Sequence, residues 1–96
     1  MTRTRLPYRR SHQITVVERS GFKLIVGIGR FDDGRVGELF IDTCKGGTAL
    51  DTILRDSAIL TSLALQAGIT ASTIRAAVTN NGPIAAVLDR IGEGVR

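Results

Sequence analysis

The sequence contains only one cysteine, Cys44, and one histidine, His12, among its 96 residues. A single thiol excludes an internal disulfide and any cysteine-rich metal cluster. A zinc site would have to be completed by carboxylates, because so few nitrogen and sulfur ligands are present. We therefore expect neither a metal ion nor another cofactor.

Aromatic residues and long apolar runs are also scarce. Trp is absent, and there are three Phe and one Tyr, so we expect an aliphatic core. No apolar run approaches the roughly 18 to 20 residues that span a bilayer, and residues 1–10 lack an apolar stretch of signal-peptide length. These absences predict a cytoplasmic protein that does not bind membranes.

Positive charge is concentrated at the N-terminus. Four arginines without any acid stand in the first ten residues, namely Arg3, Arg5, Arg9 and Arg10. From residue 11 onward nine basic residues balance nine acidic ones. We therefore divide the chain into a basic arm, residues 1–12, and one domain, residues 13–96, with a modest core. The arm either contacts nucleic-acid phosphates or is a solvated or docking segment.

Three segments in the first half have the composition of β-strands. Residues 13–19 are rich in β-branched side chains, and residues 22–30 alternate apolar and other side chains after a Ser-Gly turn. Residues 31–35, FDDGR, predict a hairpin turn in which Gly34 supplies a positive φ. A third strand is expected at 36–42. The pattern predicts an antiparallel meander with some apolar residues on its second face, which a partner chain could cover.

Three helices are expected in the second half, at 48–67, 71–79 and 83–91. In the long first helix we predict a packing stripe at helical spacing and an opposite wet face. The stripe contains Leu50, Ile53, Leu54, Ser57, Ala58, Leu60, Thr61, Ala64 and Leu65, and the wet face contains Asp51, Arg55, Ser62 and Gln66. The predicted fold is α+β, in the order β-β-β-α-α-α, with the long helix packed on the sheet.

The stretch CKGGTALD, residues 44–51, has three interpretations. Cys44 stands beside a cation and near a helix start, which favours a thiolate, but no second cysteine or suitable base accompanies it. Lys45, Gly46 and Gly47 before a helix at Thr48 could bind a phosphate through bare backbone N–H groups. The spacing is not that of a P-loop. Thr48 and Asp51 also resemble a capping box, so the stretch could equally be a structural loop.

No arrangement of catalytic residues is visible in the sequence. Glu38 and Asp42 share a strand face but lie roughly 13 Å apart at about 3.3 Å per residue. Glycosidase carboxyl pairs lie within roughly 10 Å. Neither a nucleophile elbow nor a zinc-protease motif occurs. We therefore predict no catalytic site.

Two longer stretches resemble a known family. GRFDDGRVGELFIDTCKGG, residues 29–47, and DSAILTSLALQAGI, residues 56–69, resemble the TSCPD-type domain near the C-terminus of adenosylcobalamin-dependent ribonucleotide reductases. LPYRR, residues 6–10, resembles the segment before that domain. The resemblance covers about residues 5–70. The matching positions are Asp33, Gly34, Arg35, Gly37, Glu38, Phe40, Ile41, Lys45, Gly47, Ser62, Leu63, Leu65 and Gly68.

The resemblance implies an accessory piece and not a reductase by itself. The family's Cys-Pro segment is replaced here by TNNGPI, residues 79–84, which has no cysteine. Reductase chemistry also needs a large barrel, a radical-generating cofactor and several cysteines. The resemblance adds Arg35 and Glu38 to the candidate nucleotide or phosphate site at residues 45–48.

Three hypotheses about function remain open. The first is a non-catalytic reductase-like module that binds a nucleotide or phosphate, or docks to a larger protein. The second is a homo-oligomeric interaction domain without a ligand. The third is a small nucleic-acid-binding protein that uses its arginine arm, although no aromatic stacking platform accompanies the arm.

Overall fold

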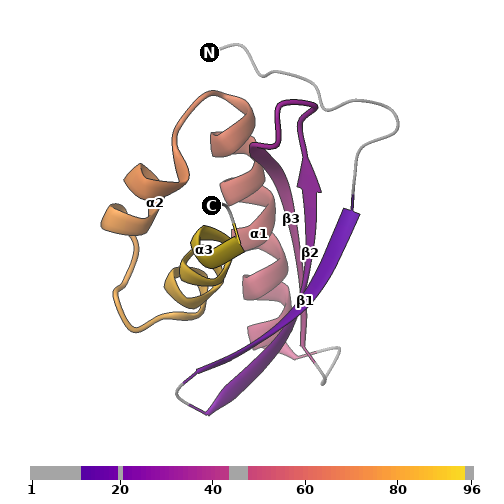
Figure 1. The fold of residues 1–96 in the computed structure, drawn as a ribbon. Helices are drawn as coiled ribbons and strands as arrows, with labels where there is room; N and C mark the ends of the chain where they lie inside the picture. Colours follow the sequence, from indigo (N-terminus) through magenta and orange to yellow (C-terminus); the bar gives the residue numbers. More distant parts are fainter. Residues whose placement is uncertain (1–11, 20, 44–47, 95–96) are drawn as a thin grey trace.

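The computed structural model describes residues 12–19, 21–43 and 48–94. The elements, in chain order, are β1 (His12–Arg19), β2 (Phe22–Arg30), β3 (Val36–Thr43), α1 (Ala49–Gln66), α2 (Ala71–Ala77) and α3 (Pro83–Gly94). The predicted α+β fold and its element order are confirmed (Figure 1).

The sheet is an antiparallel meander with strand order β1-β2-β3. Val26 lies opposite Thr15 on one side and Ile41 on the other. The turn between β2 and β3 is closed by a hydrogen bond from the Phe31 N–H to the Arg35 carbonyl, 2.8 Å. Gly34 has a φ of 91°, as predicted, because L-residues with a side chain rarely adopt this conformation.

Two helices cover one face of the sheet. α1 packs against β3 and α3 against β1, while α2 packs against α3 on the side away from the sheet (Figure 1). The core between these layers is aliphatic, as expected. Its buried members from the sheet are Val17, Leu24, Val26, Ile28, Leu39 and Ile41, and those from the helices are Leu54, Ala58, Ala86, Val87, Leu88 and Ile91.

The ends of the helices follow the expected local chemistry. Thr48 and Thr70 are the N-caps of α1 and α2, and each hydroxyl accepts a backbone N–H three residues on. Gly68, with a φ of 98°, follows the C-cap of α1, where glycine is favoured. α2 ends at Ala77, two residues earlier than predicted.

The predicted orientation of α1 is wrong for much of its surface. Leu54 is buried as expected, but Ile53 and Leu60 are 60% and 67% exposed. Asp51 and Ser62, placed on the wet face, are 5% and 7% exposed. The buried side of α1 therefore carries polar side chains as well as apolar ones, because Asp51, Ser62 and Gln66 hydrogen-bond to β3. No helix in the described ranges is long and apolar enough to cross a membrane.

Candidate functional site

The predicted phosphate site is only partly described. Lys45, Gly46 and Gly47 lie outside the described residues, as do Cys44 and the four arginines of the N-terminal arm. The proposed roles of all these residues therefore stay predictions. Thr48, Arg35 and Glu38 are described, and their positions bear on the site.

The first turn of α1 already carries a carboxylate. Thr48 Oγ1 accepts the Asp51 N–H at 3.1 Å, and the Asp51 carboxylate accepts a hydrogen bond from Thr43 Oγ1, also 3.1 Å. Arg55 forms an i,i+4 ion pair with Asp51, 3.4 Å, and also reaches Asp42, 3.2 Å. Asp51 is buried, so its negative charge opposes an anion at this end of the helix.

Arg35 and Glu38 lie toward the other end of β3. Arg35 precedes the strand and Thr48 follows it, and β3 itself contains eight residues. At about 3.3 Å per residue, the strand separates its two ends by roughly 25 Å. The structure does not bring Arg35 and Thr48 together, so one small ligand cannot contact both.

The face of α1 toward β3 is held by buried hydrogen bonds. The Leu39 N–H donates to Ser62 Oγ at 2.8 Å, and the same hydroxyl lies 3.2 Å from the Leu39 carbonyl. One helical turn further, Gln66 Nε2 donates to the Gly37 carbonyl, 2.8 Å. These side chains satisfy backbone groups of the strand that would otherwise be buried without a partner.

The side of α1 that faces away from β3 exposes several apolar side chains, with the exposed Asp56 among them. We define the outer face of α1 as Leu50, Ile53, Leu60 and Leu63, all of which are exposed large hydrophobic residues. Ile53 and Leu60 are seven residues apart, a spacing that keeps both on one side of a helix. The sequence interpretation missed this surface because it assigned Leu50, Ile53 and Leu60 to the core.

The sheet face away from the helices also exposes apolar side chains. Ile14, Val16, Ile25 and Phe40 lie there and are 40% or more exposed. A Cβ added at Gly27 would lie 3.5 Å from Phe40 side-chain atoms, so the ring lies close to this glycine. This agrees with the partly apolar second face that the sequence predicted.

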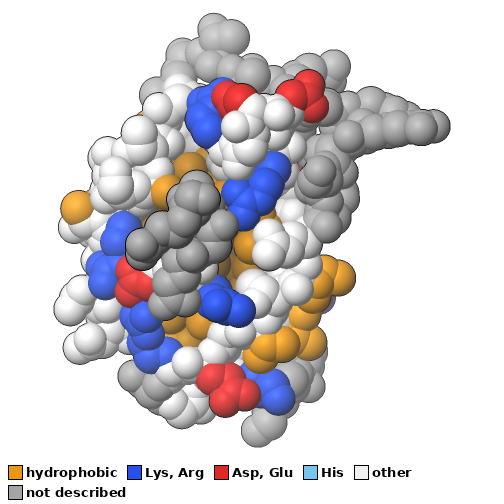
Figure 2. All heavy atoms as spheres, in the orientation of Figure 1, with side chains coloured by type: hydrophobic (Ala, Val, Ile, Leu, Met, Phe, Trp, Pro, Cys, Tyr) orange, Lys and Arg blue, Asp and Glu red, His pale blue; other side chains and the backbone are white. Residues whose placement is uncertain are grey.

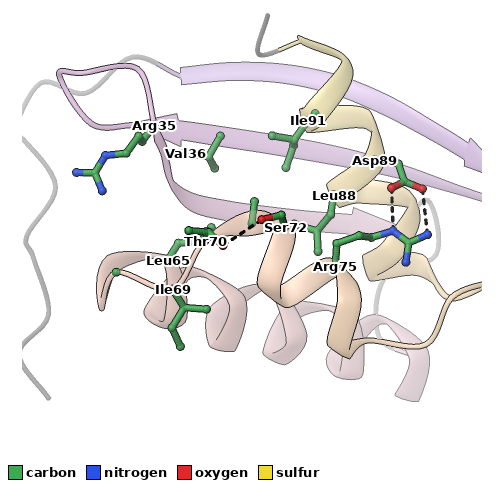
Figure 3. Close-up of a pocket in the computed structure, with 13 residues that line it drawn as sticks. Arg35, Val36, Leu65, Ile69, Thr70, Ser72, Arg75, Leu88, Asp89 and Ile91 are labelled. Atoms are coloured by element: carbon green, nitrogen blue, oxygen red, sulfur yellow. Dashed lines mark hydrogen bonds and ion pairs between the residues drawn. The ribbon is translucent and has the colours of Figure 1, made fainter.

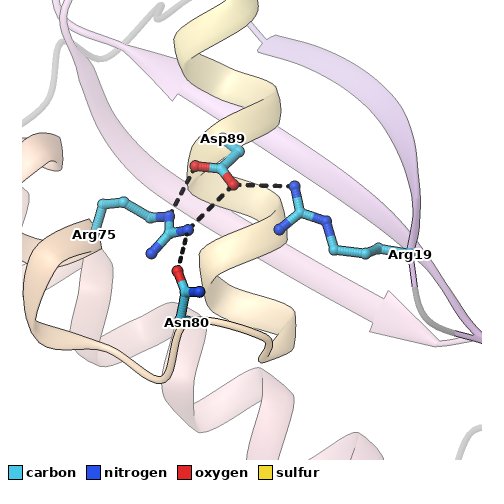
Figure 4. A network of polar contacts seen from close by, with 4 residues as sticks. All are labelled: Arg19, Arg75, Asn80 and Asp89. Atoms are coloured by element: carbon cyan, nitrogen blue, oxygen red, sulfur yellow. Dashed lines mark hydrogen bonds and ion pairs between the residues drawn. The ribbon is translucent and has the colours of Figure 1, made fainter.

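Basic side chains gather on the face that α2, α3 and β1 form (Figure 2). Within it, Asp89 of α3 binds two arginines from different elements (Figure 4). Arg75 Nε donates to Asp89 at 2.8 Å and Arg19 Nη2 donates at 3.0 Å, while Arg75 Nη2 also reaches Asn80, 2.9 Å. The cluster ties β1 and α2 to α3 and carries a net charge of +1.

The Asp89 cluster predicts a pH dependence of stability. Hydrogen bonds from Arg75 and then Arg19 lower the pKa of Asp89 below its usual 3.8. The folded state therefore favours the carboxylate, and this contribution is present above pH 3.8 and is lost as the pH falls through the lowered pKa. We expect the free energy of unfolding of Asp89→Asn to fall less between neutral and acid pH than that of the wild type, because Asn does not titrate. Urea denaturation from neutral pH to below the lowered pKa measures this.

The control for that measurement is Asp56→Asn, which removes an exposed carboxylate of α1. A control is needed because Asp33 also contributes to the acid dependence of stability: its hydrogen bonds with Arg35 lower its pKa as well. Parallel pH curves for Asp89→Asn and the wild type would contradict a role of the cluster in acid stability.

Among the described residues, no group of three or more His, Cys, Asp or Glu side chains is placed to bind a metal ion. The features that the described part does present are apolar surfaces on an α+β scaffold and a face rich in arginine.

Comparison with known proteins relates the chain to a part of a large enzyme. It is 40% identical over 63 residues to the vitamin B12-dependent ribonucleotide reductases of Bradyrhizobium diazoefficiens and of Agrobacterium fabrum. The match covers 66% of this chain but 5% of each reductase. The chain thus contains a ribonucleotide-reductase-related region and spans about a twentieth of the length of these curated relatives. No protein-family model and no solved structure matches it.

Proposed function

We propose that the chain is a non-catalytic TSCPD-type module that docks to a larger protein through the outer face of α1. The observation that carries the proposal is the distribution of side chains around this helix. Ser62 and Gln66 face β3 and are hydrogen-bonded there, whereas Ile53 and Leu60 are exposed.

The exposed apolar side chains of α1 favour binding to a partner protein that would bury them. Burying one Leu or Ile side chain completely contributes about 1.5–3 kcal/mol. Leu50, Ile53, Leu60 and Leu63 all lie on one 18-residue helix. Several exposed apolar side chains on one helix are typical of protein interaction sites, and helical spacing fits docking against a groove or another helix.

The relatives suggest what kind of partner this is. In the two reductases, the related region is a small part of a chain roughly twenty times its length. A region embedded in so long a chain has neighbours to pack against. A large reductase chain that lacks its own copy of the region is therefore the proposed partner.

The composition supports a module without its own chemistry. The whole chain has one cysteine and one histidine, whereas reductase chemistry uses several cysteines and a radical-generating cofactor. The proposal therefore assigns no catalytic residue and no cofactor to this chain. Nucleotide binding at residues 45–48 stays a prediction, and the buried Asp51 carboxylate argues against an anion at that helix end.

Binding to a truncated reductase tests the proposal. The Agrobacterium fabrum enzyme would be prepared without the 63 matching residues, and the affinity of the present chain for it measured by biolayer interferometry. We expect saturable binding by the wild type. Ile53→Glu and Leu60→Glu should each weaken it at least tenfold, because a charge would be buried in an apolar interface.

Ala76→Glu is the matched control, since Ala76 is an exposed position on α2 and receives the same charge. It should leave the affinity unchanged. Equal affinities for Leu60→Glu and Ala76→Glu would contradict docking through α1, and no binding by the wild type would contradict the proposed partner.

The outer sheet face supports a second candidate, a homo-oligomer. Ile14 is 76% exposed and lies on β1, an edge strand of the sheet. Light scattering of the chain alone decides this point. A mass of twice 10.3 kDa that returns to the monomer value in Ile14→Lys would assign the sheet face to self-association, and a monomeric wild type would exclude it.

A further inference from the structure

The two edges of the sheet differ in how their backbone groups are used. At the β3 edge, the Leu39 N–H donates to Ser62 Oγ of α1. Gln66 of the same helix donates to the Gly37 carbonyl. The N–H and C=O groups of a residue in an antiparallel strand point to one side, and successive residues alternate between the two sides. Leu39 therefore faces away from β2, and α1 covers this edge.

The same alternation determines which groups β1 presents at the other edge. Leu39 is the register partner of Ile28, so Ile28 directs its N–H and C=O toward its other partner, Gln13 of β1. The N–H and C=O groups of Ile14 and Val16 consequently point away from the sheet. Within the described ranges, no hydrogen bond from outside the sheet reaches these groups.

The middle of β1 also lacks the features that usually protect an edge strand. Charged residues, prolines and bulges deter the addition of another strand. Residues 14–17, ITVV, are uncharged, and all eight residues of β1 pair with β2 without a register shift. The edge of β1 is therefore suited to an extended segment, which would form main-chain hydrogen bonds along it.

A small cavity lies beside this edge, on the helix side of the sheet. Its volume is about 100 Å³, and its polar lining residues are Gln13, Thr15, Arg30 and Arg90. Arg90 Nε donates to Thr15 Oγ1 at 3.4 Å, and Arg30 Nη2 donates to Gln13 Oε1 at 3.3 Å. No Asp or Glu is among the described residues that line this cavity. Its lining is therefore positively charged and adjoins two side chains of β1.

A larger cavity, about 690 Å³, lies among the three helices and the start of β3 (Figure 3). Arg75 pairs there with Asp89 at 2.8 Å. Arg35 points away from the cavity and pairs with Asp33 at 2.7 Å. Both arginines of the larger cavity thus have carboxylate partners within the chain, so charge favours an acidic side chain at the smaller cavity.

We propose that the edge of β1 binds an extended acidic segment of a partner protein. The segment lies beside β1 as a further strand, with its main chain hydrogen-bonded to Ile14 and Val16. A residue opposite Thr15 has its side chain on the helix side, with its Cβ about 5 Å from that of Thr15. A Glu or Asp at this position directs its carboxylate toward Arg30 and Arg90. Apolar residues before and after it pack beside Ile14 and Val16 on the other face.

An NMR titration of the full chain with synthetic peptides tests this surface. The probe is a capped peptide with the eight-residue length of β1, in which Val and Glu alternate. We expect saturable shifts of the backbone amide signals of Ile14 and Val16, because their N–H groups gain acceptors. A peptide in which Val and Lys alternate should bind at least tenfold more weakly, because the arginines repel it. A peptide with all Val before all Glu should also bind at least tenfold more weakly, because its two faces are no longer different.

Two variants of the chain locate the peptide. Val16→Pro should weaken binding at least tenfold, because it removes an outward N–H that the sheet itself does not use, so the fold is kept. Arg90→Gln should weaken binding of the Val-Glu peptide at least threefold. Arg55→Gln is the matched control, since it removes the same charge from α1 beside β3, and it should leave the affinity unchanged. Circular dichroism checks that each variant is folded.

Several outcomes would overturn the proposal. These are equal affinities for the Val-Glu and Val-Lys peptides, full affinity in Val16→Pro, or no saturable shift. Unchanged affinity in Arg90→Gln would do the same, even where Val16→Pro failed to fold. Shifts of the Ile14 and Val16 amides that depend on the concentration of the chain alone would assign the edge to a second copy instead. None of these outcomes bears on docking through the outer face of α1, which is a separate surface.

Discussion

Leu54→Ala is expected to lower the free energy of unfolding by about 2–5 kcal/mol, whereas Leu60→Ala should change it by less than about 0.5 kcal/mol. Both leucines lie within α1, so the change in helix propensity is nearly the same. They differ in burial, because Leu54 is 4% exposed and Leu60 is 67% exposed. Urea denaturation of the two variants beside the wild type measures the difference.

This pair tests the orientation of α1 directly. The sequence pattern places both leucines in the packing stripe, and it therefore predicts similar losses. The structure predicts a large loss at Leu54 alone. Equal destabilisation by the two substitutions would contradict the structure and would indicate that Leu60 is buried in the core, as the sequence pattern predicted.

Ser62→Ala is expected to lower the free energy of unfolding by about 1–3 kcal/mol, because it leaves the buried Leu39 N–H without its acceptor. The hydroxyl accepts that N–H at 2.8 Å. Ser57→Ala is the matched control on the same helix. The Ser57 hydroxyl donates to the Ile53 carbonyl in an exposed position, and its loss should cost less than about 0.5 kcal/mol.

Denaturant midpoints of the two serine variants give this comparison. Both substitutions replace Ser with Ala in a helix interior, so their propensity gains cancel in the difference. A loss at Ser62 no larger than that at Ser57 would show that the bonds between α1 and β3 do not stabilise the fold.

The strands could be predicted from the sequence because their pattern is local. Leu24, Val26 and Ile28 are apolar and two residues apart, so they share one face of the strand, and the structure buries all three. Gly34 follows two aspartates, a combination that marks a turn, and it has the expected positive φ. The identity of neighbouring residues suffices for both features.

The orientation of α1 could not be predicted in the same way. Apolar residues occupy most of its circumference, so a helical-period pattern does not say which arc faces the sheet. That choice is made by β3, whose Leu39 and Gly37 backbone groups bind Ser62 and Gln66. One sequence signal did exist, since Ser62 stands in the motif that resembles reductase-type domains.

The candidate site was predicted least well, because it depends on long-range geometry. Arg35 and Thr48 were grouped from the resemblance, and they lie at opposite ends of β3. Leu65, Leu88 and Ile91 line one cavity although two separate helices supply them. Nothing in their local sequence indicates that they meet.

The most direct test of docking through α1 is a methyl NMR titration. The chain, labelled at Ile, Leu and Val methyl groups, would be titrated with the truncated Agrobacterium fabrum reductase. We predict that the signals of Ile53, Leu60 and Leu63 shift or broaden selectively, while those of the buried Leu24 and Leu39 do not. Changes confined to Ile14, Val16 and Ile25, or no changes at all, would contradict the proposal.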